Sequence, residues 1–304
     1  MSHSARSRFA DIALLSVSVL WGLSFPAIKM ATPFVPSVRF VALRFALATL
    51  LLLPLLPLIA REARPAGGPG AGGCFGDAAA RLRGVWLGLL LAVGYTTQTI
   101  GLHTTSAANS AFITSLSVVL VPPLAAVRCG QRPGGTVMAA LVPAVAGLAI
   151  LTRPDLGRLA AGDAWTLGCA VAYAVYLVEL SRALARAPYP PLLFWQLATV
   201  AATAGAWTLL WERAPWRWNA TVAWSLGLTT VLSTVLALYL QNRWQGRTTA
   251  SRAALLFATE PVFATLFAWL LLRERLPAAF PAGAGLILGA VLIAELTDRR
   301  PVDA

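Results

Sequence analysis

The sequence predicts an all-α integral membrane protein with ten transmembrane helices, arranged as two inverted five-helix repeats. The prediction rests on the composition, on ten long apolar segments, and on a pattern that recurs in both halves of the chain. Of 304 residues, 58% are hydrophobic and only 12% are charged, and the mean hydropathy is +0.72. Because water-soluble domains have about 25% charged residues, this composition indicates a multi-pass membrane protein.

The charge and the cysteine and histidine residues exclude several other classes. The net charge of +12 would indicate nucleic-acid binding in a soluble chain. Here the basic residues lie almost entirely between apolar segments, where membrane orientation and anionic lipid explain them, so we expect no nucleic-acid partner. The cysteines Cys74, Cys129 and Cys169 and the histidines His3 and His103 lack metal-ligand spacing. We therefore predict no metal, no cofactor and no disulfide framework.

Ten apolar segments are long enough to cross a bilayer as helices. They cover residues 9–30, 39–60, 84–102, 107–127, 135–152, 164–183, 191–211, 220–240, 250–272 and 277–296. The connection over residues 61–83 is rich in glycine and is predicted to be a flexible surface loop. The first segment is too long for a signal peptide and lacks a cleavage site, so we expect it to be an uncleaved span.

The distribution of basic residues predicts the orientation of the chain. With ten spans, both termini lie on the same side of the membrane. If that side is cytoplasmic, the inner connections and termini hold 15 arginines and the outer connections hold seven, namely Arg39, Arg153, Arg158, Arg213, Arg217, Arg273 and Arg275. Because cytoplasmic connections carry the excess of Lys and Arg, we predict a protein of the inner (cytoplasmic) membrane with cytoplasmic N- and C-termini.

The two halves of the chain share a pattern. Residues 105–133 (TSAANSAFITSLSVVLVPPLAAVRCGQRP) align with residues 248–276 (TTASRAALLFATEPVFATLFAWLLLRERL) at a shift of 143. The pattern predicts a first repeat over 1–152 and a second over 153–304. Since each half holds five spans, the second must begin on the opposite side of the membrane. Inverted repeats of this kind place a substrate site near the bilayer midplane, between the halves.

Four stretches carry a family resemblance: LLSVSVLWGLSFPAIK (Leu14–Lys29), RFVALRFALATLLLLPLL, QTIGLHTTSAANSAFITSLSVVLVP, and RAALLFATEPVFATLFAWLLLRERL with its Glu-Pro and L-x-E-R-L signatures. The chain resembles EamA-type transporters of the drug/metabolite transporter superfamily over nearly its whole length. It departs from them at Gln131, where the family often has Glu, whereas the counterpart Glu274 is present. The resemblance implies two inverted five-helix halves, alternating access, and mostly export of small metabolites or drugs. It also implies a central cavity lined by the first, third, fourth, sixth, eighth and ninth helices.

Glu260 is the sharpest candidate for a functional residue. It lies near the middle of the ninth span, directly before Pro261, which we expect to kink or open the helix. A carboxylate at the bilayer centre costs roughly 3 kcal/mol, so it should face protein or water. It could contact substrate or carry a proton. The alternative, with about equal weight, is that it bonds to the opened backbone or pairs with an arginine.

The remaining candidate substrate contacts are polar or aromatic residues within predicted spans: Trp21, Ser24, Tyr95, Gln98, Asn109, Ser115, Tyr173, Tyr176 and Gln241. Taken singly, each fits an interhelical hydrogen bond better than a ligand contact. As clusters they make a stronger case, because stacking surfaces with a few hydrogen-bonding groups suit an uncharged or zwitterionic organic substrate.

Other polar and small residues in the spans have structural interpretations. Arg44 could bind an anionic substrate, but because arginine snorkels readily from its depth in the second span, a structural role is favoured. Lys29 is expected to lie at the interface. Glu179 is predicted to pair with Arg182 one turn further on. Gly285 and Gly289 form a GxxxG pattern that predicts close helix packing on the last span.

The leading hypothesis is a secondary transporter that exports a small organic solute. Because the sequence has no P-loop, a solute or ion gradient must supply the energy; proton coupling depends on Glu260 and, like the oligomeric state, is left open. The alternative is an integral membrane enzyme acting on lipid, which would need catalytic clusters and an extramembrane domain that the sequence lacks. A passive channel would need rings of charge or filter-like loops.

Overall fold

The computed structural model describes residues 3–63, 73–130, 134–152 and 161–297. The regular secondary structure of these residues is entirely helical, with no β-strand among them. Three predictions fall partly outside the described residues: the loop over 61–83 (64–72 are not described), the position of Gln131, and the boundary between the halves at residue 153.

The helices of the first half are α1 (His3–Ala31), α2 (Ser37–Glu62), α3 (Ala78–Gly101), α4 (Ala107–Ser115), α5 (Ser117–Cys129) and α6 (Gly135–Thr152). Those of the second half are α7 (Ala161–Leu184), α8 (Tyr189–Trp211), α9 (Ala220–Leu228), the π-helix η1 (Thr229–Leu236), α10 (Ala237–Trp244), the 3₁₀-helix η2 (Gln245–Arg247), α11 (Ala250–Phe257), α12 (Glu260–Leu272) and α13 (Phe280–Thr297).

When the helices of an interrupted span are joined, the described helices form ten stretches in the predicted order. Eight helical stretches of the described chain are long and apolar enough to cross a membrane. The predicted fifth and tenth spans are shorter apolar helices, Gly135–Leu151 and Phe280–Ala294. The third span begins at Ala78 rather than residue 84, because the Asp77 side chain accepts a hydrogen bond from the Ala80 backbone N–H at 2.7 Å and so caps an earlier turn.

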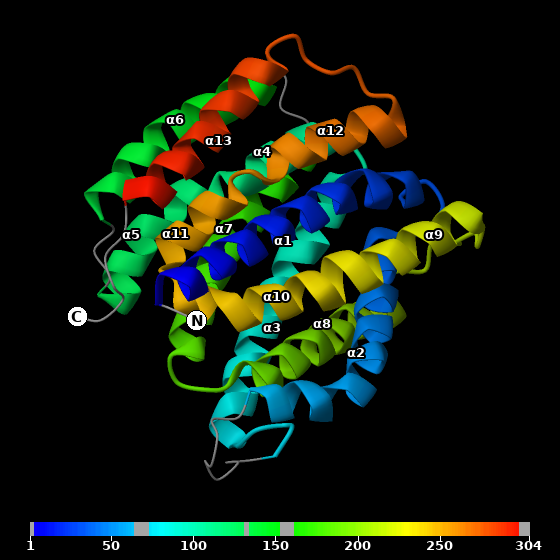
Figure 1. Ribbon diagram of the computed structural model, residues 1–304. Helices are drawn as coiled ribbons and strands as arrows, with labels where there is room; N and C mark the ends of the chain where they lie inside the picture. The colour runs from blue at the N-terminus through cyan, green and yellow to red at the C-terminus, as the bar shows by residue number, and fades with distance from the viewer. Residues whose placement is uncertain (1–2, 64–72, 131–133, 153–160, 298–304) are drawn as a thin grey trace.

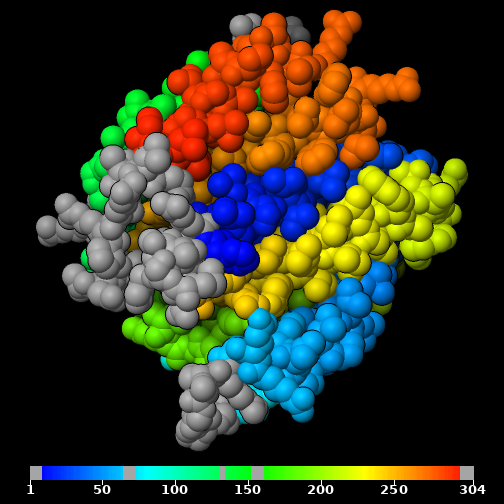
Figure 2. Space-filling model, viewed as in Figure 1, coloured from blue at the N-terminus to red at the C-terminus, as the bar shows by residue number. Residues whose placement is uncertain are grey.

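The helices pack in pairs drawn from the two halves (Figure 1). α6 packs along α13 at one edge, α2 crosses α8 near the opposite edge, and α3 contacts both α7 and α8. α1 packs along α12 and also contacts α9 and α10; Figure 2 shows it in the middle of one face, between α12 and α10. A Cβ at Gly22 would lie 2.9 Å from the Ala264 backbone nitrogen, so this glycine allows the close approach of α1 and α12.

The predicted role of the GxxxG pattern is wrong. A Cβ built at Gly285 or Gly289 would meet no atom within 4 Å. The close contact of the last span is instead made through Gly283, where a Cβ would lie 2.8 Å from the carbonyl oxygen of Gly147. α13 therefore approaches α6 on a different face from the one that the spacing indicated.

The fourth and ninth spans are each broken in the middle at corresponding positions. The fourth divides into α4 and α5 at Leu116, and the ninth divides into α11 and α12 at Ala258 and Thr259. Leu116 and Thr259 differ by the 143 residues of the sequence alignment. The ninth span therefore opens beside Pro261, as expected, but the fourth opens at the matching place without a proline. Proline alone does not explain the break.

The starts and ends of these two spans also correspond. The side chains of Ser106 and Thr249 each accept a hydrogen bond from the backbone N–H three residues on, at 3.0 and 3.2 Å. Both spans end at a residue in the left-handed region, Gly130 with φ 65° and Arg273 with φ 55°. The N-caps, the breaks and the C-terminal residues of the fourth and ninth spans are thus all related by the same shift of 143 residues.

Contacts between the connections separate into two ends of the molecule. At one end, Lys29 donates hydrogen bonds to the carbonyl oxygens of Leu102, at 2.8 Å, and of Thr105. At the other end, Glu62 pairs with Arg243 at 2.6 Å. The first group belongs to connections predicted to be outer and the second to connections predicted to be inner, so the grouping agrees with the predicted order of spans. Which end faces the cytoplasm stays a prediction.

Candidate functional site

A cavity lies where the two broken spans face each other. Its empty volume is ≈ 540 Å³. It is lined by Trp21, Ser24, Phe25, Leu91, Tyr95, Gln98, Thr114, Ser115, Ser117, Tyr173, Tyr176, Leu177, Phe257 and Glu260. The residues on either side of both breaks are among them, so the cavity is built around the two interruptions.

α1 and α7 present the same layout to this cavity. Each contributes three residues with spacings of three and one, which lie on one helix face. They are Trp21, Ser24 and Phe25 from α1, and Tyr173, Tyr176 and Leu177 from α7. The two sets are related by a shift of 152 residues, so a second pair of helices from the two halves lines the cavity in a similar way.

Aromatic rings form much of the cavity wall. The rings of Tyr95 and Tyr173 meet edge to face with centroids 5.6 Å apart, and Trp21 packs against Phe257 at 5.1 Å. A Cβ at Gly94 would lie 2.3 Å from the Tyr173 ring, so glycine is required there for the ring to be seated. These rings supply rigid stacking surfaces for an organic ligand.

Glu260 lines the cavity and is the first residue of α12. It is 6% exposed, and it makes no hydrogen bond or ion pair with any residue that the structure describes. The alternative interpretation, in which its carboxyl group bonds to the opened backbone or to an arginine, is therefore not what the structure shows. The nearby hydroxyl of Ser115 is also buried and has no partner within the described chain. The cavity thus holds polar groups available to a ligand.

The expectation that Arg44 snorkels is wrong. Its side chain is 1% exposed and points into the protein, where Nε donates a hydrogen bond to Thr234 Oγ1 at 2.5 Å. The guanidinium carbon lies 4.9 Å from the centroid of the Tyr95 ring, a cation–π contact. Because Tyr95 lines the cavity, Arg44 supports the cavity wall from behind.

Two predicted site residues lie outside the cavity. Asn109 donates hydrogen bonds to Asp163 Oδ1 at 2.6 Å and to Thr105 Oγ1 at 2.9 Å, at the same end of the molecule as Lys29. Gln241 accepts from the Tyr176 hydroxyl at 3.3 Å and donates to Gln245 at 2.9 Å. Both act as interhelical links, and Gln241 contacts the cavity only through Tyr176.

The other eight predicted residues line the cavity, although their binding of substrate stays a prediction. Six further residues line the cavity and were not predicted from the sequence: Phe25, Leu91, Thr114, Ser117, Leu177 and Phe257. Three of these six could have been predicted from two features of the sequence. Ser117 aligns with Glu260 at the shift of 143, and Phe25 and Leu177 follow Trp21 and Tyr173 by one helical turn. No group of three or more His, Cys, Asp or Glu side chains in the described residues is placed to hold a metal ion.

A bundle of long apolar helices, with a cavity between two interrupted spans that is lined mainly by aromatic and apolar side chains and by a few polar ones, is typical of a membrane transporter. The sequence profile of the EamA-like transporter family matches residues 8–153 and 160–296. The chain therefore belongs to the EamA-like transporter family and is a multi-pass membrane protein.

Two other proteins are similar to this chain, one in sequence and one in fold. An uncharacterized transporter from Archaeoglobus fulgidus is 31% identical over 296 residues, which cover 97% of this chain and 88% of that protein. A crystal structure of a protein with 20% identity has a TM-score of 0.72 and covers 96% of this chain and 98% of its own. The first similarity indicates transport rather than an enzymatic reaction, and the second shows the fold alone.

Proposed function

We propose that this protein is a secondary transporter that exports a small organic solute across the cytoplasmic membrane by alternating access, with both termini in the cytoplasm. The observation that carries the proposal is the cavity between two interrupted spans, with the carboxyl group of Glu260 free of any partner among the described residues. Isolated buried charge is costly. A carboxyl group kept in such a place is therefore suited to bind a proton or a positively charged group of the substrate.

Alternating access needs two halves that can exchange roles, and inverted repeats supply them. Two contacts support this arrangement. Arg252 pairs with Asp11 at 2.9 Å, and Asn109 donates to Asp163 at 2.6 Å. Asn109 and Arg252 are related by the shift of 143, and Asp11 and Asp163 by the shift of 152. In inverted repeats, related contacts lie at opposite ends, so we propose that each holds one end of the pathway closed.

The wall of the cavity favours an uncharged or zwitterionic organic substrate. Trp21, Tyr95 and Tyr173 provide stacking surfaces, and Ser115 and Gln98 provide a few hydrogen-bonding groups. In a zwitterion, an ammonium group would face Glu260. Lacking a nucleotide-binding motif, the protein would draw on a solute or proton gradient, and Glu260 is the proposed proton carrier.

The experiment has two stages. A small-metabolite library is first screened for compounds that raise the melting temperature of the detergent-purified protein, since a ligand of the folded state stabilises it by mass action. Flux of the compound found is then measured in proteoliposomes at two pH values for the wild type, Glu260→Gln and the control Glu274→Gln, whose side chain lies outside the cavity. We expect saturable counterflow of unchanged solute, whose pH dependence is lost in Glu260→Gln only.

Three results would count against the proposal. Unchanged pH dependence in Glu260→Gln rules out this residue as the proton carrier. Flux that does not saturate would indicate a channel. Chemical turnover of a labelled lipid by the purified protein would favour the membrane enzyme instead.

A further inference from the structure

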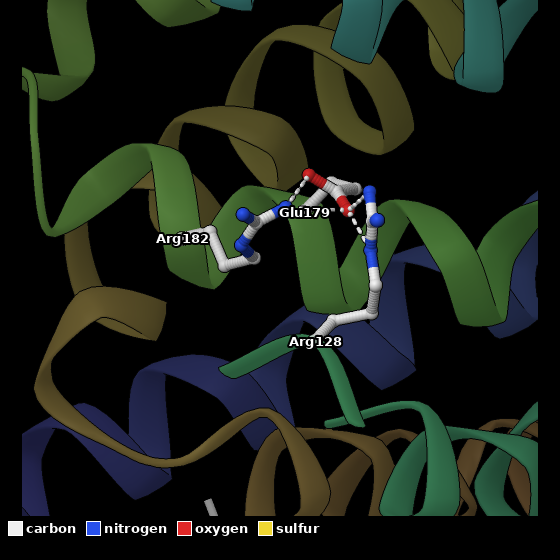
Figure 3. Close-up of polar contacts among 3 residues, drawn as sticks. All are labelled: Arg128, Glu179 and Arg182. Carbon is white, nitrogen blue, oxygen red and sulfur yellow. Dashed lines mark hydrogen bonds and ion pairs between the residues drawn. The ribbon is translucent and has the colours of Figure 1, made fainter. Parts of the chain in front are cut away.

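A cluster of arginines lies outside the central cavity and shares no lining residue with it, at the end of the molecule where the last turns of α5 and α7 meet the start of α3. At its centre, the carboxylate of Glu179 is held between two arginines (Figure 3). Arg128 donates to Oε1 through Nε at 3.0 Å and Nη2 at 2.7 Å, and Arg182 donates to Oε2 through Nη1 at 2.8 Å. The predicted pair of Glu179 with Arg182 is thus confirmed, and Arg128 from α5 is added to it.

Two cavities flank this cluster and share arginine side chains. One is lined by Arg128, Cys129, Ser181, Arg182, Ala185 and Arg186, and the other by Arg83, Trp86, Leu87, Glu179, Arg182, Ala183 and Arg186. Their empty volumes are ≈ 490 and ≈ 370 Å³. Four arginines therefore surround them with one carboxylate, which leaves a strong excess of positive charge.

Several guanidinium groups in these cavities have N–H donors that make no hydrogen bond with the described residues. Arg83 and Arg186 make no side-chain hydrogen bond or ion pair with the part of the chain that the structure describes. Within the same residues Arg182 donates only through Nη1, to Glu179. Because Glu179 orients Arg128 and Arg182 and leaves other N–H groups unused, the cluster presents fixed donors toward an anion from more than one helix.

The surroundings of the cluster indicate where the anion comes from. On α3, Trp86 is 48% exposed and Leu82 is 71% exposed, and on α5 Val127 is 83% exposed. In a membrane protein, such outward apolar side chains contact acyl chains. Tryptophan is enriched at the headgroup level, and Trp86 lies near the start of the span predicted over 84–102. In a bilayer, these side chains would place the arginine-lined cavities next to lipid, at the depth of its charged groups.

We propose that these two cavities form one binding site for a phosphate group, supplied by the headgroup of an anionic phospholipid whose acyl chains lie along the outer face of α3. Guanidinium groups recognise phosphate through paired N–H donors. Basic pockets between transmembrane helices suit anionic headgroups. The site is separate from the central cavity and does not depend on which solute is transported.

The test uses the full-length protein purified in a neutral detergent. Phosphatidylglycerol, phosphatidylcholine and inorganic phosphate are titrated separately, with retained lipid measured by native mass spectrometry and stability by the melting temperature. We expect phosphatidylglycerol to be retained and to raise the melting temperature, with little effect of the other two. The double variant Arg83→Gln/Arg186→Gln should bind it about tenfold more weakly, because charge-assisted hydrogen bonds are lost.

These variants are chosen because neither arginine pairs with a described residue, so the substitutions break no contact within that part of the fold. The matched control Arg213→Gln/Arg275→Gln removes the same charge at the opposite end and should bind as the wild type does. Equal retention of both lipids, undiminished binding by the first double variant, or an equal loss in the control would each overturn the proposal. If inorganic phosphate stabilises the protein as much as phosphatidylglycerol and displaces it, the lipid source is wrong. None of these measurements depends on transport, so the lipid-binding proposal can fail while the proposed transport function holds, and the reverse.

Discussion

The fourth and ninth spans have the same backbone design and different chemistry. Both begin at a hydroxyl N-cap, open in the middle beside the cavity, and end in a left-handed residue. Where α12 begins with Glu260, α5 begins with Ser117, and where α11 carries Arg252, α4 carries Asn109. The shared features make the cavity, and the differing side chains make its two sides unequal. A transporter built this way can have related contacts at its two ends without having equal ones.

The largest expected difference between the two halves is in how much each end contact contributes to the free energy of unfolding. The pair of Arg252 with Asp11 is nearly buried, with side chains 11% and 6% exposed. Asp11→Asn removes the charged partner that lies 2.9 Å from Arg252 in this nearly buried pair, so it should lower the free energy of unfolding by about 3 kcal/mol. Asp163→Asn removes the charge but keeps an oxygen that can accept from Asn109 and Thr105, so it should cost only about 1 kcal/mol. Thermal and denaturant unfolding of both variants in detergent measure the difference. Equal losses would mean that the two contacts are energetically alike.

Exchanging the residues at the two breaks tests the chemistry of the cavity. Glu260→Ser should reduce solute binding or flux by about tenfold, as expected for loss of one charged hydrogen bond. Ser117→Glu combined with Glu260→Ser returns a carboxyl group to the related position of the other repeat, and part of the activity should return. Ser117→Ala is the matched control and should change flux by less than about twofold. Full activity in Glu260→Ser would show that the carboxyl group has no part in transport.

At the C-terminal ends of the two spans, substitutions should have smaller effects on the free energy of unfolding, and the two effects should have opposite signs. Arg273 has φ 55°, which costs a residue with a Cβ about 1 kcal/mol, whereas its counterpart Gly130 has φ 65° at no such cost. Arg273→Gly should therefore raise the free energy of unfolding by about 1 kcal/mol, and Gly130→Ala should lower it by a similar amount. Melting temperatures of the two variants, measured side by side, check both signs. A loss of stability in Arg273→Gly would show that its side chain makes a contact worth more than the strain.

The features that the sequence predicted well are those set by local patterns. Ten apolar segments, the shift of 143 and the pair of Glu179 with Arg182 follow from hydropathy, alignment and helix geometry. What it could not predict depends on which helix lies opposite. Arg44 was expected to snorkel because the sequence does not reveal its contacts with Thr234 and Tyr95. Gly285 and Gly289 form a packing motif, but no helix of the described chain lies against them. Asn109 was assigned to the site although Asp163 holds it at the end of the molecule.

The smallest expected effect concerns the role of proline in the breaks. Pro261 is the second residue of α12, where a missing N–H costs no helical hydrogen bond, so Pro261→Ala should lower the free energy of unfolding by less than about 1 kcal/mol, through the entropy of the unfolded chain. Pro123 lies inside α5, where proline removes a hydrogen bond, so Pro123→Ala should be stabilising. The two variants are compared by thermal unfolding in the same detergent. If Pro261→Ala proved the more stabilising of the two, the proline would be holding the ninth span open. The matching break at Leu116, which has no adjacent proline, argues that the packing around the cavity holds it open instead.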